Sequence, residues 1–402
     1  MRILVANKFW YRRGGLERVM FDEIALLEAS GHEVGHFSSA HPENIASPWS
    51  GTFVPYLELG SGGQLSASQK VLAASRMFSN IEAARRFAAV IQDFRPDVVH
   101  VHGIHRQLSP SILLAARAAG VPVVQTLHDY HHICPADVLL RGGTDVCNPR
   151  RCGTFWYGPA MSNRCVHESR AASVLSSAET SFQRLRRVYE KTIARFISPS
   201  EFLAQAIADG GWATPCDVIP NAVPLSACAS GGGYVLFAGR LSPEKGVDTF
   251  LAAAKAAGVQ ALVAGEGPLE SDLRRRFPEV EFRGRVDGPT VQSLIQGSLA
   301  CVVPSTWYEN APMSVLEPMA AGVPVVASRI GGIPEIIEDG VSGILVRPGD
   351  VSELAAALVR LSTDIAFATR LGSSGRERIA ARFLPADHLR RLLETYDAAR
   401  LS

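Results

Sequence analysis

Residues 304–322 have the sequence PSTWYENAPMSVLEPMAAG and follow the apolar run ACVV at 300–303. The order predicts a buried strand, a short polar loop and a helix that begins at about Pro312. Proline suits the first helical position, because its missing N–H would have no partner there. Such a helix start offers backbone N–H groups and the positive end of a dipole, and both favour a phosphate. We therefore predict a strand–loop–helix unit of an α/β fold that carries a phosphate site.

Two glutamates flank this predicted helix start. Glu309 lies in the loop before it, and Glu317 projects from the helix. An ionised carboxylate only accepts hydrogen bonds, so one carboxylate can hold sugar hydroxyls and the other can hold ribose hydroxyls. The pair predicts a nucleotide-sugar site. The spacing by itself also fits two ordinary solvated charges near a helix end.

The composition limits the class of protein. The chain has 402 residues, enough for two domains of ordinary size, and a formal net charge of +1. Because the charge is balanced and aromatic-basic platforms are absent from the sequence, we expect no nucleic-acid partner. The apolar residues near Met1 are too few for a signal peptide, and no apolar run is long enough to cross a bilayer. We expect a cytoplasmic protein.

Alternating strand and helix patterns occupy both halves of the chain. Between them, residues 222–233 contain Pro224 and end in the run SGGG, which favours a flexible linker. The pattern predicts a first domain over residues 1–221 and a second over 234–382, each with a doubly wound parallel sheet. A hinge between them would allow two sheets to close over a ligand.

Two cations stand close together at the start of the second half. A predicted strand runs into GRLSPEKG, residues 239–246, which places Arg240 and Lys245 across one strand-to-helix loop. Both heads can converge on one anion, the arginine through two parallel hydrogen bonds and the lysine as a point charge. They could also be two unrelated surface cations.

The first half offers two further candidate positions. Gly14 and Gly15 follow the first predicted strand, where glycine permits a positive φ and a close approach of backbone to a ligand. His128 and Asp129 follow a later strand, at the edge where open α/β sheets bind ligands. A plain tight turn and a structural histidine are the respective alternatives; His100, His102 and His105 are weaker candidates.

Four cysteines cluster in a glycine- and proline-rich segment that is long for a loop: Cys134, Cys147, Cys152 and Cys165. Four thiolates could close a structural zinc site, with His131, His132 and His167 as substitute ligands. However, the spacing lacks the tight CxxC pairs of zinc ribbons, so unpaired buried or incidental thiols remain the alternative.

A basic stretch follows the cysteine segment. Residues 169–195 are expected to be helical and contain four arginines and a lysine between positions 184 and 195. A basic amphipathic helix could contact an anionic membrane surface, here the inner one, or bind an anionic acceptor. A solvated helix face is the alternative.

The stretch 304–322, with the following VPVVAS and GGIPEIIEDGVSGILV, closely resembles the donor-site signature of glycosyltransferase family 4. Family members are retaining enzymes of the GT-B fold. The resemblance is densest from Gly239 to Asp350, where GRLSPEKG resembles the family's diphosphate-binding motif. The pair Gly14–Gly15 resembles its N-terminal glycine loop, and His128–Asp129 resembles an element whose histidine contacts the donor sugar.

The resemblance implies an α/β protein with two Rossmann-like domains that face across a cleft, and a last helix, residues 383–402, that returns to the first domain. It implies transfer of a sugar from a UDP- or GDP-type donor to a hydroxyl of a glycan, a lipid-linked acceptor or a small molecule, with no cofactor or catalytic metal required. Catalytic roles fall on Glu309, His128, Arg240 and Lys245. Donor binding falls on Gly14, Gly15, Arg240, Lys245, Gly265, Gly267, Arg285, Val286, Glu309, Ala311, Pro312, Met313 and Glu317.

The sequence departs from the family pattern at Pro318, where a small helix former is usual. A proline inside a helix removes one hydrogen bond and bends the axis, so Glu317 could point elsewhere. Two other functions remain open for the same fold. A sugar-nucleotide epimerase would share the diphosphate site but would need acid/base carboxylates at the sugar ring. A non-catalytic subunit would keep the cleft without turnover.

Overall fold

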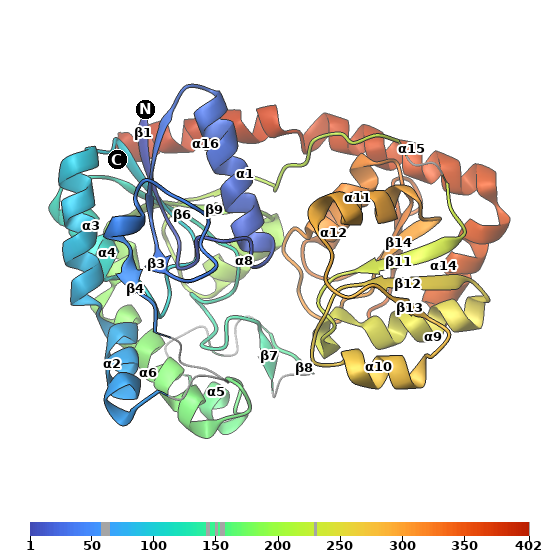
Figure 1. Cartoon of the computed structure of the whole chain (residues 1–402), viewed down its shortest axis with the longest axis horizontal. Helices are drawn as coiled ribbons and strands as arrows, with labels where there is room; N and C mark the ends of the chain where they lie inside the picture. Colours follow the sequence, from blue (N-terminus) through green and yellow to red (C-terminus); the bar gives the residue numbers. More distant parts are fainter. Residues whose placement is uncertain (58–64, 142–144, 149–151, 153–156, 229–230, 402) are drawn as a thin grey trace. The chain divides into compact units, whose positions relative to one another are not determined.

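The computed structural model describes residues 1–57, 65–141, 145–148, 152, 157–228 and 231–401 (Figure 1). These residues form two compact units. The first comprises Met1–Pro199, Leu203–Ile219 and Leu389–Ser402, and the second comprises Ser200–Phe202 and Pro220–His388. Each unit contains one six-stranded sheet, in which all paired strands run parallel. The two parallel sheets confirm the predicted α/β class.

The sheet of the first unit has the strand order β10-β9-β6-β5-β1-β2. The order changes direction at β1, which pairs with both β2 and β5, so the switch point lies between β1 and β5. Its strands are β1 (Arg2–Ala6), β2 (Glu33–Phe37), β5 (Val98–Val101), β6 (Val123–Thr126), β9 (Ile193–Ser198) and β10 (Cys216–Val218). Its helices are α1 (Gly15–Ala29), α2 (Ala67–Phe78), α3 (Ile81–Phe94), α4 (Ser111–Ala118), α5 (Gly158–Ser162), α6 (Arg170–Arg186) and α7 (Val188–Thr192), and α8 (Glu201–Asp209) begins in the second unit's segment. Short pairs are formed by β3 (Ser39–Ala40) with β4 (Val54–Pro55) and by β7 (Leu140–Arg141) with β8 (Asp145–Val146).

The core of the first unit joins distant parts of the chain. Ile3 and Val5 on β1 pack with Ile24 and Leu27, which recur at helical spacing on α1. The C-terminal part of α16 (Pro385–Arg400) belongs to the same core through Leu392, Tyr396 and Ala399. The N-terminus and the end of α16 consequently lie in the same unit (Figure 1).

The sheet of the second unit has the strand order β13-β12-β11-β14-β15-β16, which corresponds to the order 3-2-1-4-5-6 of a Rossmann fold. Its switch point lies between β11 and β14, which pair directly. The strands are β11 (Tyr234–Ala238), β12 (Gln260–Ala264), β13 (Glu281–Phe282), β14 (Ala300–Val303), β15 (Val325–Ser328) and β16 (Ile344–Val346). The helices are α9 (Val247–Ala257), α10 (Glu270–Arg276), α11 (Gly288–Gln296), α12 (Met313–Ala320), α13 (Ile333–Ile336), α14 (Val351–Thr363), α15 (Ile365–Arg382) and the first turn of α16.

The apolar strands of this sheet are buried on both faces, as continuous apolar runs predict. Every residue of β14 and β15 is buried. The core on one side includes Phe250 of α9 and Leu358 of α14, and another cluster includes Leu316 of α12. Because helices cover the sheet, ligand access is restricted to its edges and to the loops at the strand ends.

The prediction of one basic helix over residues 169–195 was wrong. Helix α6 ends at Arg186, and Arg187 adopts a left-handed conformation with φ 52° before α7 begins. Ile193 already belongs to β9, where its β-branched and aromatic neighbours favour a strand. Arg184 is buried against Trp212, and Arg195 pairs with Asp217 at 2.7 Å, so these cations share no single helix face.

Candidate functional site

The loops that follow the neighbouring strands β11 and β12 of the second sheet lie in close contact. Gly265 has φ 141°, and a Cβ atom there would lie 1.9 Å from the carbonyl oxygen of Gly239. A Cβ atom on Gly267 would lie 2.4 Å from the carbonyl oxygen of Leu241. Glycine is therefore required at both predicted positions, because only bare backbone lets the two loops lie so close.

The loop after β11 is also held against the loop after β14. A Cβ atom on Gly246, which has φ 68°, would lie 2.0 Å from the carbonyl oxygen of Pro304. The N–H of Thr306 donates to the carbonyl oxygen of Glu244 at 2.9 Å. The predicted GRLSPEKG loop and the 304–322 stretch, which lie far apart in sequence, are consequently neighbours in the structure.

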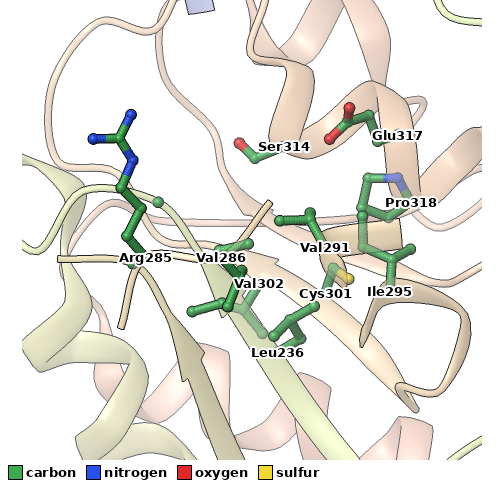
Figure 2. Close-up of a pocket in the computed structure, with 14 residues that line it drawn as sticks. Leu236, Arg285, Val286, Val291, Ile295, Cys301, Val302, Ser314, Glu317 and Pro318 are labelled. Carbon is green, nitrogen blue, oxygen red and sulfur yellow. The ribbon is translucent and has the colours of Figure 1, made fainter. Parts of the chain in front are cut away.

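A pocket of about 260 Å³ opens where these strands end (Figure 2). Its floor is apolar and comes from the strands β11 and β14 and from α11. The lining residues are Leu236, Ala238, Gly239, Ala264, Gly265, Arg285, Val286, Val291, Ile295, Cys301, Val302, Ser314, Glu317 and Pro318. The structure thus brings the predicted residues Gly265, Arg285, Val286 and Glu317 together around one cavity.

The polar groups of this pocket come from opposite sides. Ser314 and Glu317 project from α12, whereas Arg285 lies on the other side of the apolar floor (Figure 2). Glu317 is buried, with 4% of its surface exposed. Pro318 lies inside α12, yet Glu317 still lines the pocket, so the proline does not turn this carboxylate away from it.

Lys245 and Glu309 form an ion pair next to the start of α12. Lys245 Nζ lies 2.7 Å from Glu309 Oε1, and the hydroxyl of the buried Ser305 donates to the same oxygen at 2.7 Å. Lys245 Nζ also lies 4.9 Å from the centre of the Trp307 ring. The ammonium is held between a carboxylate and an aromatic face.

The ionisation of Glu309 depends on that lysine. Burial by itself would raise the pKa of the Glu309 carboxyl, but the charge of Lys245 and hydrogen bonds from Lys245 and Ser305 hold the pKa below its ordinary value. Glu309 is therefore a carboxylate at neutral pH. Arg240 is exposed and, among the residues that the structure describes, pairs with no carboxylate, so it remains available to an anion.

The helix start lies one residue later than predicted. Pro312 is the residue before the helix, with an extended ψ of 127°, and Met313 is the first helical residue. The N–H groups of Met313 and Ser314 fall in the first turn, where no helical carbonyl precedes them. Ala311 is buried, and its carbonyl oxygen accepts a hydrogen bond from Asn221 Nδ2 at 2.9 Å. The predicted phosphate-binding N–H groups thus stand at the mouth of an eight-residue helix.

In the first unit, Gly14 and Gly15 lie at the start of α1, as the glycine turn predicts. The expected positive φ does not occur: Gly14 is extended with φ −162°, and Gly15 is already helical. The chain enters α1 directly from an extended residue, so no left-handed turn is needed. A Cβ atom on Gly15 would meet nothing within 4 Å, and the buried Glu17 lies beside Gly14.

His128 is joined to a second histidine that the sequence did not single out as a strong candidate. His128 Nε2 lies 2.9 Å from His102 Nδ1, and His102 Nε2 lies 3.6 Å from Glu23 Oε2. Burial lowers the pKa of His128 to about 4, so its imidazole is neutral at pH 7. The signal in the sequence was the HVH triplet of 100–102, which places two histidines on one face of a strand.

Glu23, His100 and His102 also form, in the described part of the chain, the one group of three residues with metal-capable atoms within 4.8 Å of each other. Both ring nitrogens of His100 are engaged, with Thr126 Oγ1 at 2.7 Å and with the Tyr396 hydroxyl at 2.7 Å. A metal would have to displace one of these bonds, so the geometry fits a hydrogen-bonded network better.

None of the four clustered cysteines belongs to that group. Cys134 is buried, whereas Cys147, Cys152 and Cys165 are half-buried. Parts of their segment (142–144, 149–151 and 153–156) lie outside the described residues. A structural zinc site stays a prediction.

Comparison with known proteins identifies the family. The pattern of "Glycosyltransferase Family 4" matches residues 13–227, and that of "Glycosyl transferases group 1" matches residues 232–364. The chain belongs to glycosyltransferase family 4. The two matches meet near residue 230, so together they cover most of both units.

Curated relatives agree with this assignment. A glycogen synthase of Mycobacterium tuberculosis is 29% identical over 310 residues, which cover 73% of this chain and 66% of that protein. A sulfoquinovosyl transferase of Arabidopsis thaliana is 33% identical over 304 residues, which cover 73% of this chain and 55% of that protein. The aligned part thus spans less than two thirds of the length of each relative.

Solved structures support the GT-B fold. A sucrose-phosphate synthase from Thermosynechococcus elongatus has a TM-score of 0.71 at 19% identity, covering 99% of this chain and 98% of its own. HepE of Anabaena, in complex with UDP and glucose, has a TM-score of 0.67 at 20% identity. The match covers 99% of this chain and 100% of the HepE chain. This family 4 chain shows, in its described residues, no helix with the length and hydropathy of a membrane span. A cytoplasmic location stays a prediction.

Proposed function

We propose that this family 4 protein is a retaining glycosyltransferase that moves a sugar from a UDP- or GDP-type donor to an acceptor hydroxyl without a catalytic metal. The observation that carries the proposal is the pocket at the β11–β14 switch point, with Glu317 in its wall and the Lys245–Glu309 pair in the adjoining loops. An apolar floor suits a base, and a carboxylate in the wall suits ribose hydroxyls.

The second unit offers a place for each part of a nucleotide sugar. The base would lie on the apolar floor near Val286, with Glu317 and Ser314 holding the ribose hydroxyls. The diphosphate would lie between Arg240, Lys245 and the helix N–H groups of Met313 and Ser314. Because Glu309 adjoins Lys245, its second oxygen would hold hydroxyls of the transferred sugar.

From the family resemblance we also propose that His128 contacts the donor sugar. The neutral imidazole both donates and accepts one hydrogen bond, so it suits a hydroxyl group. For the loop that contains Gly14 and Gly15, the resemblance implies contact with the diphosphate and the acceptor. These roles are proposed from the family resemblance together with the places of the residues at the carboxyl ends of β1 and β6.

The chemistry requires stabilisation of a leaving group. As the bond between the anomeric carbon and the phosphate oxygen breaks, both bonding electrons pass to the nucleoside diphosphate. Arg240, Lys245 and the N–H groups of α12 would neutralise that charge without rearranging. The acceptor hydroxyl would attack from the same face, and its proton would pass to the departing phosphate oxygen, which retains the anomeric configuration.

The names of the relatives support the donor class but differ in sugar and acceptor. The HepE structures contain UDP, UDP with glucose, or UDP-glucose, which favours a UDP-type donor. The curated relatives include enzymes named for glycogen, for kanosamine and for sulfoquinovose. We therefore propose a glycan, lipid-linked sugar or small molecule as the acceptor class.

The test is a donor screen with purified protein. UDP- and GDP-sugars are incubated with and without acceptors, nucleoside diphosphate release is measured, and the anomeric configuration of the product is read by proton NMR. We expect release with a UDP- or GDP-sugar and an axial-to-axial or equatorial-to-equatorial outcome. Interconversion of free sugar nucleotides without acceptor would indicate an epimerase instead. Absence of turnover with all donors, despite nucleotide binding, would indicate a non-catalytic subunit.

A further inference from the structure

A second hollow, of about 690 Å³, lies in the first unit. Its walls include Pro122, Thr192 and Pro215, which lie at or just before the starts of β6, β9 and β10, and Arg400 at the end of α16. His128 follows β6 at its other end. The hollow therefore lies at the amino-terminal edge of the sheet, opposite the edge that carries the candidate residues for sugar transfer.

Cations dominate the polar lining of this hollow. Arg117, Arg187, Lys191 and Arg400 line it, together with one carboxylate, Glu190. Among the residues that the structure describes, Arg117, Arg187 and Lys191 pair with no carboxylate. An anion in the hollow would therefore meet cations whose charge is not already neutralised.

Arg400 differs from these three, because it has carboxylates of its own. Its guanidinium lies 3.4 Å from Asp397 and 3.9 Å from Asp97. Both distances leave room for a further acceptor, since a guanidinium offers five N–H donors. Arg400 would thus complete the cation lining from the side of α16.

The local backbone keeps two of these cations on one side of a short helix. Arg187 has φ 52° between α6 and α7, and the N–H of Lys191 donates to the carbonyl oxygen of Arg187 at 3.1 Å. Like charges four residues apart repel each other, and a positive φ is uncommon for arginine. A bound anion would offset that repulsion.

Glu190 indicates a second requirement on the ligand. Its Oε2 atom is buried and has no hydrogen-bond partner within the described residues. An ionised carboxylate only accepts hydrogen bonds, and Glu190 lines the hollow, so a ligand with a hydroxyl donor suits this residue. The lining therefore matches a molecule that carries both a phosphate and hydroxyl groups.

We propose that the hollow at the amino-terminal edge of the first sheet is a binding site for a phosphorylated sugar or another phosphate-bearing polyol. The phosphate binds between Arg117, Arg187, Lys191 and Arg400, and a hydroxyl donates to Glu190. The proposal does not depend on the proposed transfer reaction, because it uses another edge of another sheet.

Isothermal titration calorimetry with the full chain tests the site. The probes are glucose 6-phosphate, inorganic phosphate and glucose, each in the presence of saturating UDP to block the nucleotide pocket. We expect glucose 6-phosphate to bind most tightly. The Arg187→Ala/Lys191→Ala double variant should lose roughly tenfold or more in its affinity. Glu190→Gln should weaken the binding of glucose 6-phosphate more than that of inorganic phosphate, so the ratio of the two affinities should fall.

Two controls make the result decisive. Arg186→Ala removes a neighbouring cation that does not line the hollow and should leave the affinity unchanged. The melting temperature and circular dichroism spectrum of the double variant report whether its fold is intact. Binding of glucose 6-phosphate that survives the double substitution would overturn the proposal. So would binding only to vesicles with anionic phosphatidylglycerol, compared with phosphatidylcholine vesicles, since that result assigns the cations to a membrane surface.

Discussion

His102 Nδ1 lies 2.9 Å from His128 Nε2, so the two imidazoles share one proton between them. The far nitrogen of His102 lies 3.6 Å from the carboxylate of Glu23, and all three side chains come from different elements of the first unit. If the charge of Glu23 favours N–H on the His102 nitrogen that faces it, His102 Nδ1 is the acceptor. His128 would then donate from Nε2 and carry its lone pair on Nδ1.

The first prediction concerns Glu23. Glu23→Gln removes the charge that sets this tautomer, so we expect the nitrogen-15 NMR signals of His128 to shift toward a mixture of tautomers. If His128 contacts the donor sugar, kcat should fall by roughly tenfold while the donor KM changes little. Glu28→Gln, an exposed change on the same helix, is the control. Unaltered histidine signals in Glu23→Gln would show that Glu23 does not set the tautomer of His128, whatever the activity.

The second prediction concerns Lys245. Lys245→Ala should lower turnover by roughly a hundredfold, because it removes a cation from the proposed diphosphate site. It also leaves Glu309 buried without its partner, which should cost about 1–3 kcal/mol of unfolding free energy at pH 8. Lys255→Ala, an exposed lysine with a partner 3.8 Å away, is the control.

The same variant has a defined pH dependence. In the native protein the pKa of Glu309 is depressed, so its stabilisation is present above the ordinary glutamate pKa and is lost as pH falls through the depressed value. Without Lys245, burial would raise this pKa, so the carboxyl would take up a proton more readily on folding. Urea unfolding at several pH values should show that Lys245→Ala lowers the free energy of unfolding less at pH 5 than at pH 8. An equal loss of unfolding free energy at every pH would contradict the proposed dependence of Glu309 ionisation on Lys245.

The third prediction concerns Glu317. If this carboxylate holds the ribose hydroxyls, Glu317→Ala should weaken UDP binding by roughly tenfold, as expected for a lost charge-assisted hydrogen bond. Binding of 2′-deoxy-UDP should change less, because one hydroxyl is already missing. Calorimetric titration of both nucleotides checks this, with Glu279→Ala as an exposed control. An equal loss for both nucleotides would place Glu317 away from the 2′-hydroxyl.

The fourth prediction concerns the cysteine segment. If Cys134, Cys147, Cys152 and Cys165 hold a structural zinc, the purified protein should contain about one zinc per chain by mass spectrometry of the metal. Cys165→Ser should lower that content and the melting temperature together. Cys228→Ser, an exposed cysteine outside the segment, should change neither. A metal-free native protein with unchanged stability would leave these cysteines as ordinary thiols.

The parts of the site that are local in sequence were predictable. The 304–322 stretch and the 239–246 loop each contain their own strand end, turn and helix start, so their chemistry could be inferred from residue order. The pairing of Lys245 with Glu309 is not local in sequence. It depends on strands β11 and β14 lying next to each other in the sheet, as they do in a Rossmann fold. It was the family resemblance that indicated that the 239–246 loop and the 304–322 stretch would contact each other.

The other features of the structure depend on tertiary contacts, which cannot be predicted from a local sequence pattern. Glu23 and His102 are 79 positions apart and meet because β1 and β5 are adjacent. The break at Arg187 was missed because an arginine in a helical pattern carries no sign of a positive φ. The cation-lined hollow combines positions 117 and 400, which only the completed fold brings together.

The buried hydrogen bond between Tyr396 and His100 joins residues 296 positions apart. Because Leu392 and Tyr396 complete the core around β1, that core stays unfinished on a ribosome until α16 has emerged. The second unit, whose segments are almost contiguous, has no such delay. We expect a chain stopped after Ala386 to show early tryptic cleavage within residues 1–219, while residues 234–382 resist; equal resistance of both parts would argue against this order of assembly.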